Sequence, residues 1–429
     1  MQYLALYIGV LVIFWAFYVR RKRRVQREHA EQLKQSIEAG LAEPPSLHPM
    51  VDPLRCLGSS SCVRTCPEEA LGIVNGKAVL VNAAACIGHG ACLKACPVDA
   101  IKLVFGTEKR GIDIPNVTPE FESNVRGVFI AGELGGMGLI RKAAEQGRQA
   151  IEVIRKRTAG QFDFDVVIVG CGPAGLSAGL SSIEHKLRYK LIEQEESLGG
   201  AVFHYPRNKI AMTAPVTLAI VGKVRFGEVQ KEKLLEFWLG VVDKTGLQIS
   251  FRECMEAVEE DQGGFIVRTS RGQYRTRSVL LTMGRRGSPR KLDVEGEETP
   301  KVVYRLVDPS QYTGQAVLVV GGGDSALEAA VTLAEEAGTE VTLSYRSAAF
   351  SRVKQKNRAA LERLQQSGRL RVELESTVQR IDPDAVTLKT KGGPVRLRNE
   401  AVIVCAGGLL PTPLLQKIGI RFETKYGTV

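Results

Sequence analysis

The chain opens with a long apolar stretch followed at once by positive charge. Residues 2–19 carry no charge, whereas each of the residues 20–24 is Arg or Lys. Eighteen residues of α-helix rise about 27 Å, close to the ~30 Å hydrocarbon core of a bilayer. Charge placed after the apolar stretch disfavours a cleaved signal peptide. The pattern therefore predicts a transmembrane helix over 1–20, with a buried or interfacial helix as the alternative, and a charged stalk and linker over 21–46.

Charge asymmetry also predicts where the chain resides. Under the positive-inside rule, the basic run and everything after it face the cytoplasm. This predicts a single-pass protein of the bacterial inner (cytoplasmic) membrane that contacts membrane lipid through its N-terminal helix. The net charge of +11 is high, but no nucleic-acid-binding motif accompanies it, so nucleic acid is not an expected partner.

A strand–glycine–helix pattern occurs twice further along. In FDVVIVGCGPAGLSAGLSSI (164–183), a β-branched run precedes three spaced glycines and a helical pattern, and an acid ends the next strand about 20 residues later. Such units bind dinucleotides, because the glycines let the backbone approach a pyrophosphate at a helix N-terminus and the acid bonds a ribose hydroxyl. The predicted cofactor-binding residues of this unit are Gly170, Gly172, Pro173, Ala174, Gly175 and Glu193.

The second unit, 316–346, differs at its far end. Its predicted binding residues are Gly321, Gly323, Asp324, Ser325, Arg346 and Arg352. The strand EVTLSYR ends in Arg346 rather than in an acid, and arginine accommodates the 2′-phosphate of NADPH. Arg352, with Lys354 as a further candidate, would complete the phosphate site. The sequence thus favours NADPH over NADH.

Six of the nine cysteines fall into two copies of one unit. CLGSSSCVRTCP (56–67) and CIGHGACLKACP (86–97) both match C-x2-C-x2-C-x3-C-P, the bacterial iron–sulfur run, except that Ser59 and His89 replace the second cysteine. Thiolates are soft ligands suited to iron. Zinc sites usually show paired C-x2-C knuckles, which are absent, and the other alternative is a relic without metal.

Residues 47–106 resemble the two-cluster bacterial ferredoxins. The resemblance implies that Cys56, Cys62 and Cys96 hold one cluster and that Cys86, Cys92 and Cys66 hold the other. His89 is a credible further ligand because imidazole binds iron, and Ser59 is a poorer one. The missing second cysteines leave the clusters open between the 4Fe-4S and 3Fe-4S types.

The two glycine units, with GGGDSALEAA in the second, resemble the thioredoxin-reductase-like flavoproteins, in which the first loop binds FAD and the second NADPH. HYPRNKIAMTAPVTLAIVGKV (204–224) resembles the bacillithiol-disulfide-reductase-like subgroup, and like it this chain has no C-x-x-C in the nicotinamide domain. Such proteins need a GVFxAGD strand and helix to complete the flavin pocket. Here GVFIAGE, with Gly132 and Glu133, stands ahead of the first glycine loop, which indicates a circular permutation.

The predicted fold class is α/β, with two Rossmann-like FAD/NAD(P)-binding domains of the thioredoxin-reductase type, a small α+β ferredoxin-like domain and an N-terminal transmembrane helix. The ferredoxin-type domain covers 47–106 and the displaced flavin segment 107–158. The FAD-binding domain covers 163–286 and the NADPH-binding domain 287–407. Residues 408–429 return to the FAD domain.

The predicted function is that of an oxidoreductase that passes electrons from NADPH through FAD to two iron–sulfur clusters and on to a partner. A quinone, a cytochrome and a ferredoxin are all compatible acceptors, and the flavoprotein resemblance implies a homodimer. Hydride transfer requires no catalytic acid or base, so no catalytic residue is assigned. One alternative is a low-molecular-weight disulfide reductase, for which Cys171 is the candidate thiol. The other is a non-catalytic electron-relay or redox-sensing subunit of a membrane complex.

Overall fold

The computed structural model describes residues 2–38, 43–44, 47–88, 90–108, 111–136, 138–157, 160–205, 207, 209–213, 215–285, 287, 289–350 and 353–427. It divides into two compact units. The N-terminal unit holds the residues up to Ile112, with the described parts of Ala349–Arg363 and of Lys425–Val429. The larger unit holds Asp113–Ala348 and Leu364–Thr424.

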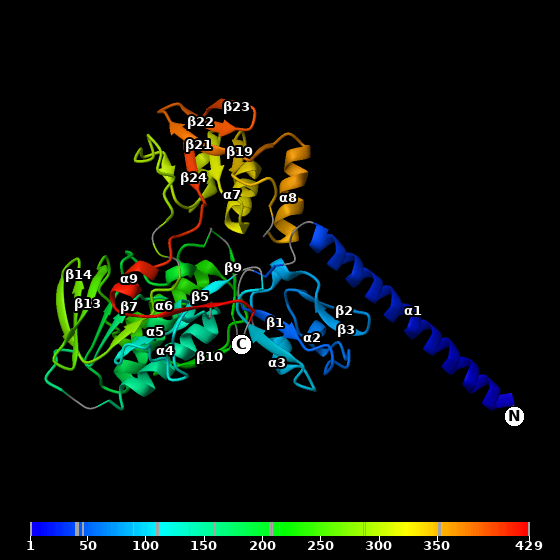
Figure 1. The fold of residues 1–429 in the computed structure, drawn as a ribbon, viewed down its shortest axis with the longest axis horizontal. Coiled ribbons are helices and arrows are strands. Elements are labelled where there is room, and N and C mark those ends of the chain that lie inside the picture. The colour runs from blue at the N-terminus through cyan, green and yellow to red at the C-terminus, as the bar shows by residue number, and fades with distance from the viewer. Residues whose placement is uncertain are drawn as a thin grey trace. The chain divides into compact units, whose positions relative to one another are not determined.

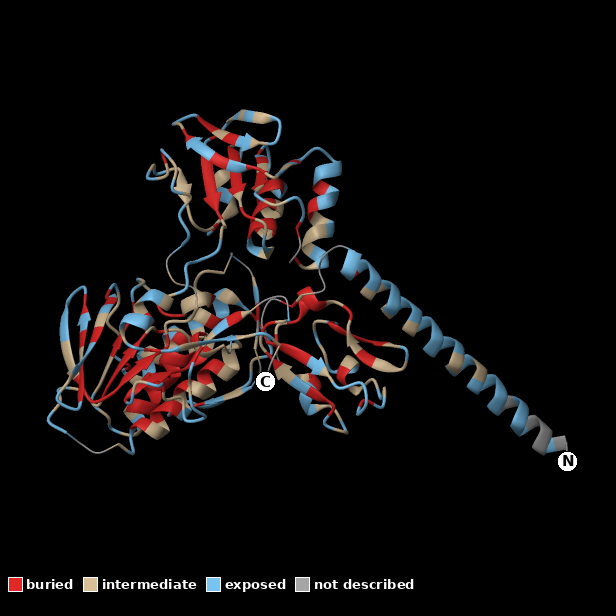
Figure 2. Cartoon of the chain, viewed as in Figure 1, coloured by how far each residue is buried: buried red, intermediate tan, exposed pale blue. Residues whose placement is uncertain are grey.

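The N-terminal unit begins with the long helix α1 (Gln2–Glu38), which is mostly exposed (Figures 1 and 2). Its second half contacts the domain that follows: the Ile73 N–H donates to Nδ1 of His29 at 3.0 Å, and Ser36 Oγ donates to the Val81 carbonyl at 2.8 Å. That domain contains the antiparallel pairs β1 (His48–Val51) with β4 (Ile101–Val104) and β2 (Leu71–Val74) with β3 (Lys77–Leu80). The single-turn helices α2 (Ser61–Arg64) and α3 (Ala91–Lys94) each lie within one cysteine unit.

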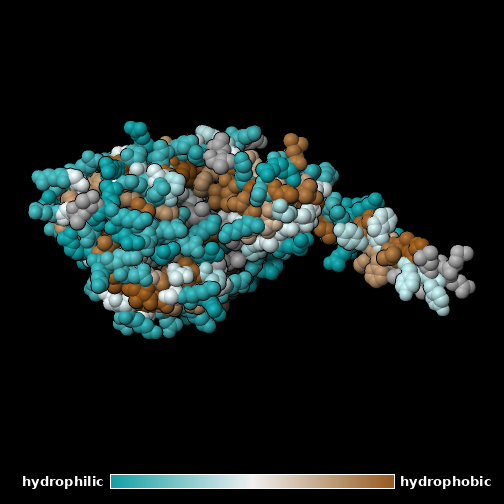
Figure 3. Space-filling model, turned by 90° about the horizontal axis from the view of Figure 1, so that it is seen from below, coloured by the Kyte–Doolittle hydropathy of each residue, from teal (hydrophilic) through white to brown (hydrophobic). Residues whose placement is uncertain are grey.

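The predicted membrane location is wrong. Among the described residues, no helix combines the length and the apolar character needed to cross a membrane. Several apolar side chains of α1 are exposed (Figure 3), and positive charge begins at Arg20. The predictions of a transmembrane helix and of a single-pass inner-membrane protein are therefore corrected, whereas contact with membrane lipid stays a prediction.

The larger unit contains a parallel sheet ordered β6-β16-β7-β8, built from β6 (Val128–Ile130), β16 (Val279–Leu281), β7 (Val166–Val169) and β8 (Tyr189–Ile192). All residues of β6, β16 and β7 are buried, as expected of parallel strands covered on both faces. Helices α4 (Ile140–Ile154) and α5 (Pro173–Glu184) pack against one face of the sheet. The meander β13 (Met255–Asp261), β14 (Gly264–Thr269) and β15 (Gly272–Thr276) packs with the other.

The remaining elements of this domain surround the sheet. Small antiparallel pairs join β9 (Ile210–Met212) to β12 (Glu228–Gln230) and β10 (Val216–Leu218) to β11 (Gly222–Val224), and α6 (Lys231–Thr245) follows. The chain returns at its end through α9 (Thr412–Lys417) and β25 (Phe422–Lys425), which pairs with β5 (Ile112–Pro115). Leu415 and Ile420 lie in the same core cluster as Val128 and Val167.

A second parallel sheet, ordered β17-β24-β18-β19-β20, forms the other dinucleotide-type domain. Its strands are β17 (Val302–Val303), β24 (Ala401–Val404), β18 (Ala316–Val320), β19 (Glu340–Tyr345) and β20 (Leu370–Leu374). Its helix is α7 (Asp324–Glu335), and its meander is β21 (Thr377–Ile381), β22 (Ala385–Thr390) and β23 (Gly393–Arg398). Most of α8 (Gln355–Gln366) belongs to the N-terminal unit. The predicted α/β fold with two such domains is confirmed.

Candidate functional site

Two small cavities in the N-terminal unit are each bordered by three cysteines. Cys56, Cys62 and Cys96 border the first cavity. Cys66, Cys86 and Cys92 border the second. Each cavity therefore takes two sulfurs from one copy of the repeated unit and the third from the other copy, which is the crossed grouping that the ferredoxin resemblance implied.

The two cysteine loops adopt matching backbone conformations. Gly58 and Gly88 both have positive φ, 67° and 74°, as do Glu69 and Asp99 at 49° and 48°. A Cβ atom on Gly58 would lie 2.1 Å from the Gly76 carbonyl oxygen, and one on Gly88 would lie 2.6 Å from the Leu47 carbonyl oxygen. Glycine is therefore required at both positions, because the loop must bend closely around its cavity.

The donor set fits a multi-iron cluster. Three thiols border each cavity, and cysteine thiolates are the ligands that hold iron–sulfur clusters. Burial raises the pKa of the Cys92 thiol to about 11, and the sulfurs of Cys86, Cys66 and Cys62 add to the rise. Bound iron would supply the positive charge that keeps such grouped sulfurs ionised. The backbone N–H groups of Ala78 and Ala100 donate to the sulfurs of Cys56 and Cys96 at 3.4 and 3.2 Å, contacts that tune a cluster's potential.

Of the two positions that lack the second cysteine, the structure describes only the one in the first unit. Ser59 borders the first cavity and is exposed. His89, the predicted further ligand at the second cavity, lies outside the described residues.

The largest cluster of predicted cofactor residues lines one cavity of the larger unit. Seven of the eight residues predicted for the flavin border it, namely Gly132, Glu133, Gly170, Gly172, Pro173, Ala174 and Glu193. The eighth, Gly175, lies in the first turn of α5, where a Cβ atom would lie 1.8 Å from the Gly170 carbonyl oxygen. Gly170 has φ of 99°. The loop thus approaches the helix closely, as a pyrophosphate-binding turn requires.

Glu193 holds the glycine loop from the end of β8. Its side chain is buried, and its two carboxylate oxygens accept hydrogen bonds from the Cys171 N–H at 2.6 Å and the Glu195 N–H at 3.0 Å. Burial raises the pKa of this carboxyl, against the effect of those hydrogen bonds. The position suits the ribose of a dinucleotide bound at the adjacent glycine turn.

The segment expected to be displaced completes this cavity. Strand β6 pairs in parallel with β16, and the Gly132 N–H at its end donates to Oε1 of Gln146 in α4 at 2.8 Å. Gly147 in the same helix lies against α5, where a Cβ atom would be only 2.0 Å from the Ala174 carbonyl oxygen. Residues that precede the glycine loop in sequence therefore form part of the same wall.

Sequence reasoning missed several cavity residues. Thr282, Met283 and Gly284 follow β16 and line the cavity. The Thr282 hydroxyl lies in hydrogen-bond distance of the carbonyl oxygens of Val169, at 2.9 Å, and Gly170, at 2.7 Å. The only signal in the sequence was that TMG follows a buried strand. His204 and Tyr205, the first two residues of the 204–224 segment quoted above, also line the cavity.

Cys171 is a poor candidate for a reactive thiol. It is 0% exposed, and burial together with the charge of Glu193 raises the pKa of its thiol far above the usual range. A nucleophilic cysteine needs access and a thiolate, and Cys171 has neither. Cys254 is exposed and borders the cavity, but it lies beside Gln194, at the Glu193 end.

The second glycine loop lies at the carboxyl end of β18, where α/β sheets bind nucleotides. Gly321 has φ of 145°, Gly323 precedes the first turn of α7, and Asp324 and Ser325 begin that helix. The Tyr345 ring covers Gly322, with ring carbons 2.2 Å from where a Cβ atom would lie. Arg346 is exposed at the end of β19. Arg352 lies outside the described residues, and Lys354 pairs instead with Glu68, at 3.9 Å within the N-terminal unit.

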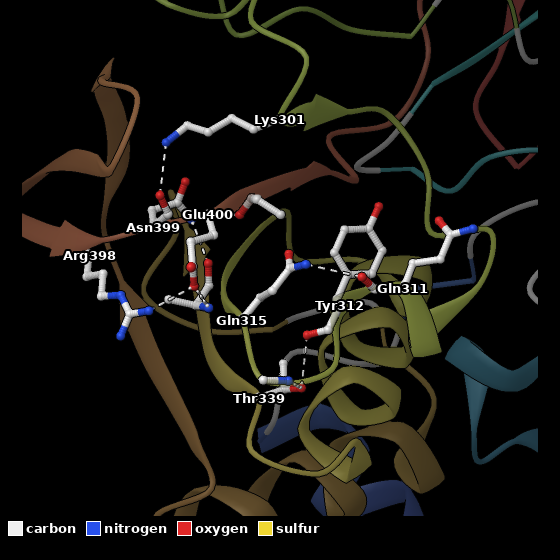
Figure 4. A network of polar contacts seen from close by, with 11 residues as sticks. Lys301, Gln311, Tyr312, Gln315, Thr339, Arg398, Asn399 and Glu400 are labelled. Atoms are coloured by element: carbon white, nitrogen blue, oxygen red, sulfur yellow. Dashed lines mark hydrogen bonds and ion pairs between the residues drawn. The ribbon is translucent and has the colours of Figure 1, made fainter.

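The amino ends of the same strands are tied by a polar network (Figure 4). Asn399 is 1% exposed, and its Nδ2 donates to the carbonyl oxygens of Ala401 at 2.6 Å and Ala316 at 3.3 Å. The Ala316 N–H donates to Glu400 at 2.8 Å. A cavity also opens at this edge, but it lies opposite the glycine loop, so the network serves the domain's structure rather than a nucleotide.

These features define a class of protein: an oxidoreductase with paired dinucleotide folds and an iron–sulfur domain. Residues 167–428 match the model of the pyridine nucleotide-disulphide oxidoreductase family, and the chain belongs to that family. Residues 48–97 match the 4Fe-4S dicluster domain. The predicted cofactors, namely FAD, NADP(H) and two iron–sulfur clusters, agree with these two families.

Individual relatives share part of the chain. It is 33% identical over 193 residues to ferredoxin–NADP reductase 2 of Shouchella clausii, which covers 44% of this chain and 55% of the relative. It is 25% identical over 268 residues to the bacilliredoxin reductase of Bacillus subtilis, covering 61% and 82%. The solved structure of bacillithiol disulfide reductase from Staphylococcus aureus aligns with a TM-score of 0.52 at 25% identity, covering 60% of this chain and 80% of that one. The chain thus spans about half the length of the ferredoxin–NADP reductase.

Proposed function

We propose that this protein is an NADPH-dependent flavin and iron–sulfur oxidoreductase that exchanges electrons with a small electron-transfer protein of the ferredoxin type. FAD, when bound, would supply the chemistry that links the two-electron nicotinamide to one-electron carriers. Gly170, Gly172 and Glu193 would hold the flavin dinucleotide, and the six cavity cysteines would hold the clusters. The name ferredoxin–NADP reductase, borne by a relative, supports this choice of partner.

One observation carries the proposal: where the thiols lie. The nicotinamide domain, 287–407, contains no C-x-x-C pair. The cysteine inside the flavin loop, Cys171, is fully buried. Six other cysteines border two cavities suited to clusters. The proposal therefore assigns cluster sites, rather than a dithiol, as the acceptors of electrons from the flavin.

The test uses the full chain with its cofactors loaded under anaerobic conditions. NADPH should bleach the flavin absorbance and then produce the electron paramagnetic resonance signals of reduced clusters. Dithionite serves as the reference, because it reduces clusters without the flavin. Clusters that dithionite reduces but that stay oxidised after the flavin has been bleached by NADPH would rule out the proposed path.

A second candidate function is NADPH-dependent reduction of a low-molecular-weight disulfide. It is favoured by the likeness to bacillithiol disulfide reductase. In this case a disulfide substrate should drive NADPH consumption in protein whose clusters have been removed. Cys171→Ala should leave that consumption unchanged, because the buried thiol is not accessible to a substrate.

A further inference from the structure

The first cysteine cavity has four ligand positions, Cys56, Ser59, Cys62 and Cys96, and the one at Ser59, here called the Ser59 corner, differs from the other three. Cys56 and Cys62 are only 8% and 7% exposed, and Cys96 receives the N–H bond from Ala100. The position that would hold a fourth cysteine carries Ser59, which is exposed. Three sulfurs therefore enclose the cavity, and a hydroxyl on the solvent side takes the place of the fourth.

Ser59 is poorly suited to bind iron. Iron clusters take soft thiolates, and a thiol ionises near pH 8.5, whereas an aliphatic hydroxyl stays protonated throughout the physiological range. The Ser59 hydroxyl is also engaged within its own loop: its Oγ lies 3.4 Å from Ser61 Oγ and accepts from the Ser61 N–H at 3.5 Å. Its local geometry is that of a turn-stabilising serine.

Two cations stand beside this corner. Lys77 Nζ donates to the Cys56 carbonyl at 2.7 Å. The Arg64 guanidinium donates to the Ser59 carbonyl at 3.4 Å and to Ser61 Oγ at 3.3 Å. Leu57, next to Cys56, is 73% exposed, so the corner opens to solvent. Positive charge around an accessible corner favours an anionic ligand from solution.

We propose that the first cluster keeps one iron without a protein ligand, and that the Ser59 corner is a binding site for a small thiolate. The incoming thiol gives its proton to solvent base, its sulfur bonds the iron in place of a solvent ligand, and no electron is transferred. The inference rests on the cluster domain alone and does not require the proposed path from NADPH.

The test compares Ser59→Cys with Ser59→Ala in the full chain, with clusters rebuilt anaerobically and reduced by dithionite. The probe is 2-mercaptoethanol, and ethylene glycol, its oxygen counterpart, is the control. We expect the wild-type resonance spectrum to change saturably with the thiol and not with the glycol. Ser59→Ala should keep that response and its iron content. In Ser59→Cys, the signal of the first cluster should no longer change with the thiol, because the added thiolate occupies the Ser59 corner.

Three results would overturn the proposal. The first is a wild-type resonance spectrum that does not change with the thiol. The second is a Ser59→Cys spectrum that keeps the full wild-type response to the thiol. In the third, Ser59→Ala would lose iron along with the response, which would make Ser59 itself the ligand. Circular dichroism of both variants establishes that they fold, and dithionite reduction without nucleotide keeps the result separate from any failure of the flavin.

Discussion

The close contact between α4 and α5 provides a sharp test of how the early segment joins the flavin domain. Replacing Gly147 with Ala would place a carbon 2.0 Å from the Ala174 carbonyl oxygen, a separation that real Cβ atoms essentially never show. The helices must therefore move apart by about 1 Å. Overpacking costs about 1–3 kcal/mol, and the better helix propensity of alanine returns about 1 kcal/mol. We expect a net loss of about 1 kcal/mol and weaker retention of FAD.

Gly240 is the matched control. It also lies inside a helix, α6, but a Cβ atom there would have nothing within 4 Å. Gly240→Ala should stabilise the domain by about 1 kcal/mol through helix propensity alone. The two variants should therefore differ by about 2 kcal/mol in urea unfolding, followed by the rise in fluorescence as flavin is released. Equal midpoints for Gly147→Ala and Gly240→Ala would refute the packing described here.

Three further predictions concern other parts of the larger unit. Arg346→Ala should raise KM for NADPH about tenfold, through loss of a charge-assisted phosphate contact, and leave KM for NADH unchanged in steady-state assays; an equal rise for both would contradict the phosphate role. Glu253 is buried, and although burial opposes it, hydrogen bonds from Thr269 and Tyr274, both 2.6 Å, lower the pKa of its carboxyl. A carboxyl with a lowered pKa stabilises the fold above its ordinary pKa, and this stabilisation is lost as the pH falls through the lowered pKa. The difference in stability between wild type and Glu253→Gln should therefore shrink below pH ~4.5 in acid unfolding. A difference independent of pH would exclude this role of Glu253. Asn399→Leu should cost about 1–3 kcal/mol in thermal unfolding, because the Ala316 and Ala401 carbonyls lose their buried donor.

The sequence predicted the parts of the fold that follow from local pattern. Buried β-branched runs such as 166–169 gave the parallel strands, and the spaced glycines marked the turns because close backbone approach excludes side chains. The grouping of the cysteines came from resemblance rather than from spacing. Thr282 could not be assigned, because its role depends on β16 pairing with a strand far away in sequence. The contact of α1 with the next domain through His29 and Ser36 could not be predicted either, since charged helical residues predict only exposure.

The position of β6 has a consequence for the order of events during protein synthesis. The N-terminal unit's strand pairs close within the first 104 residues, so they can form as soon as they leave the ribosome. Strand β6 emerges after β5, but its neighbour β16 is made only after the whole glycine-loop segment. The edge strand must therefore wait for its partner, so the strand pairs beside the cysteine loops can form before the wall of the flavin cavity is complete.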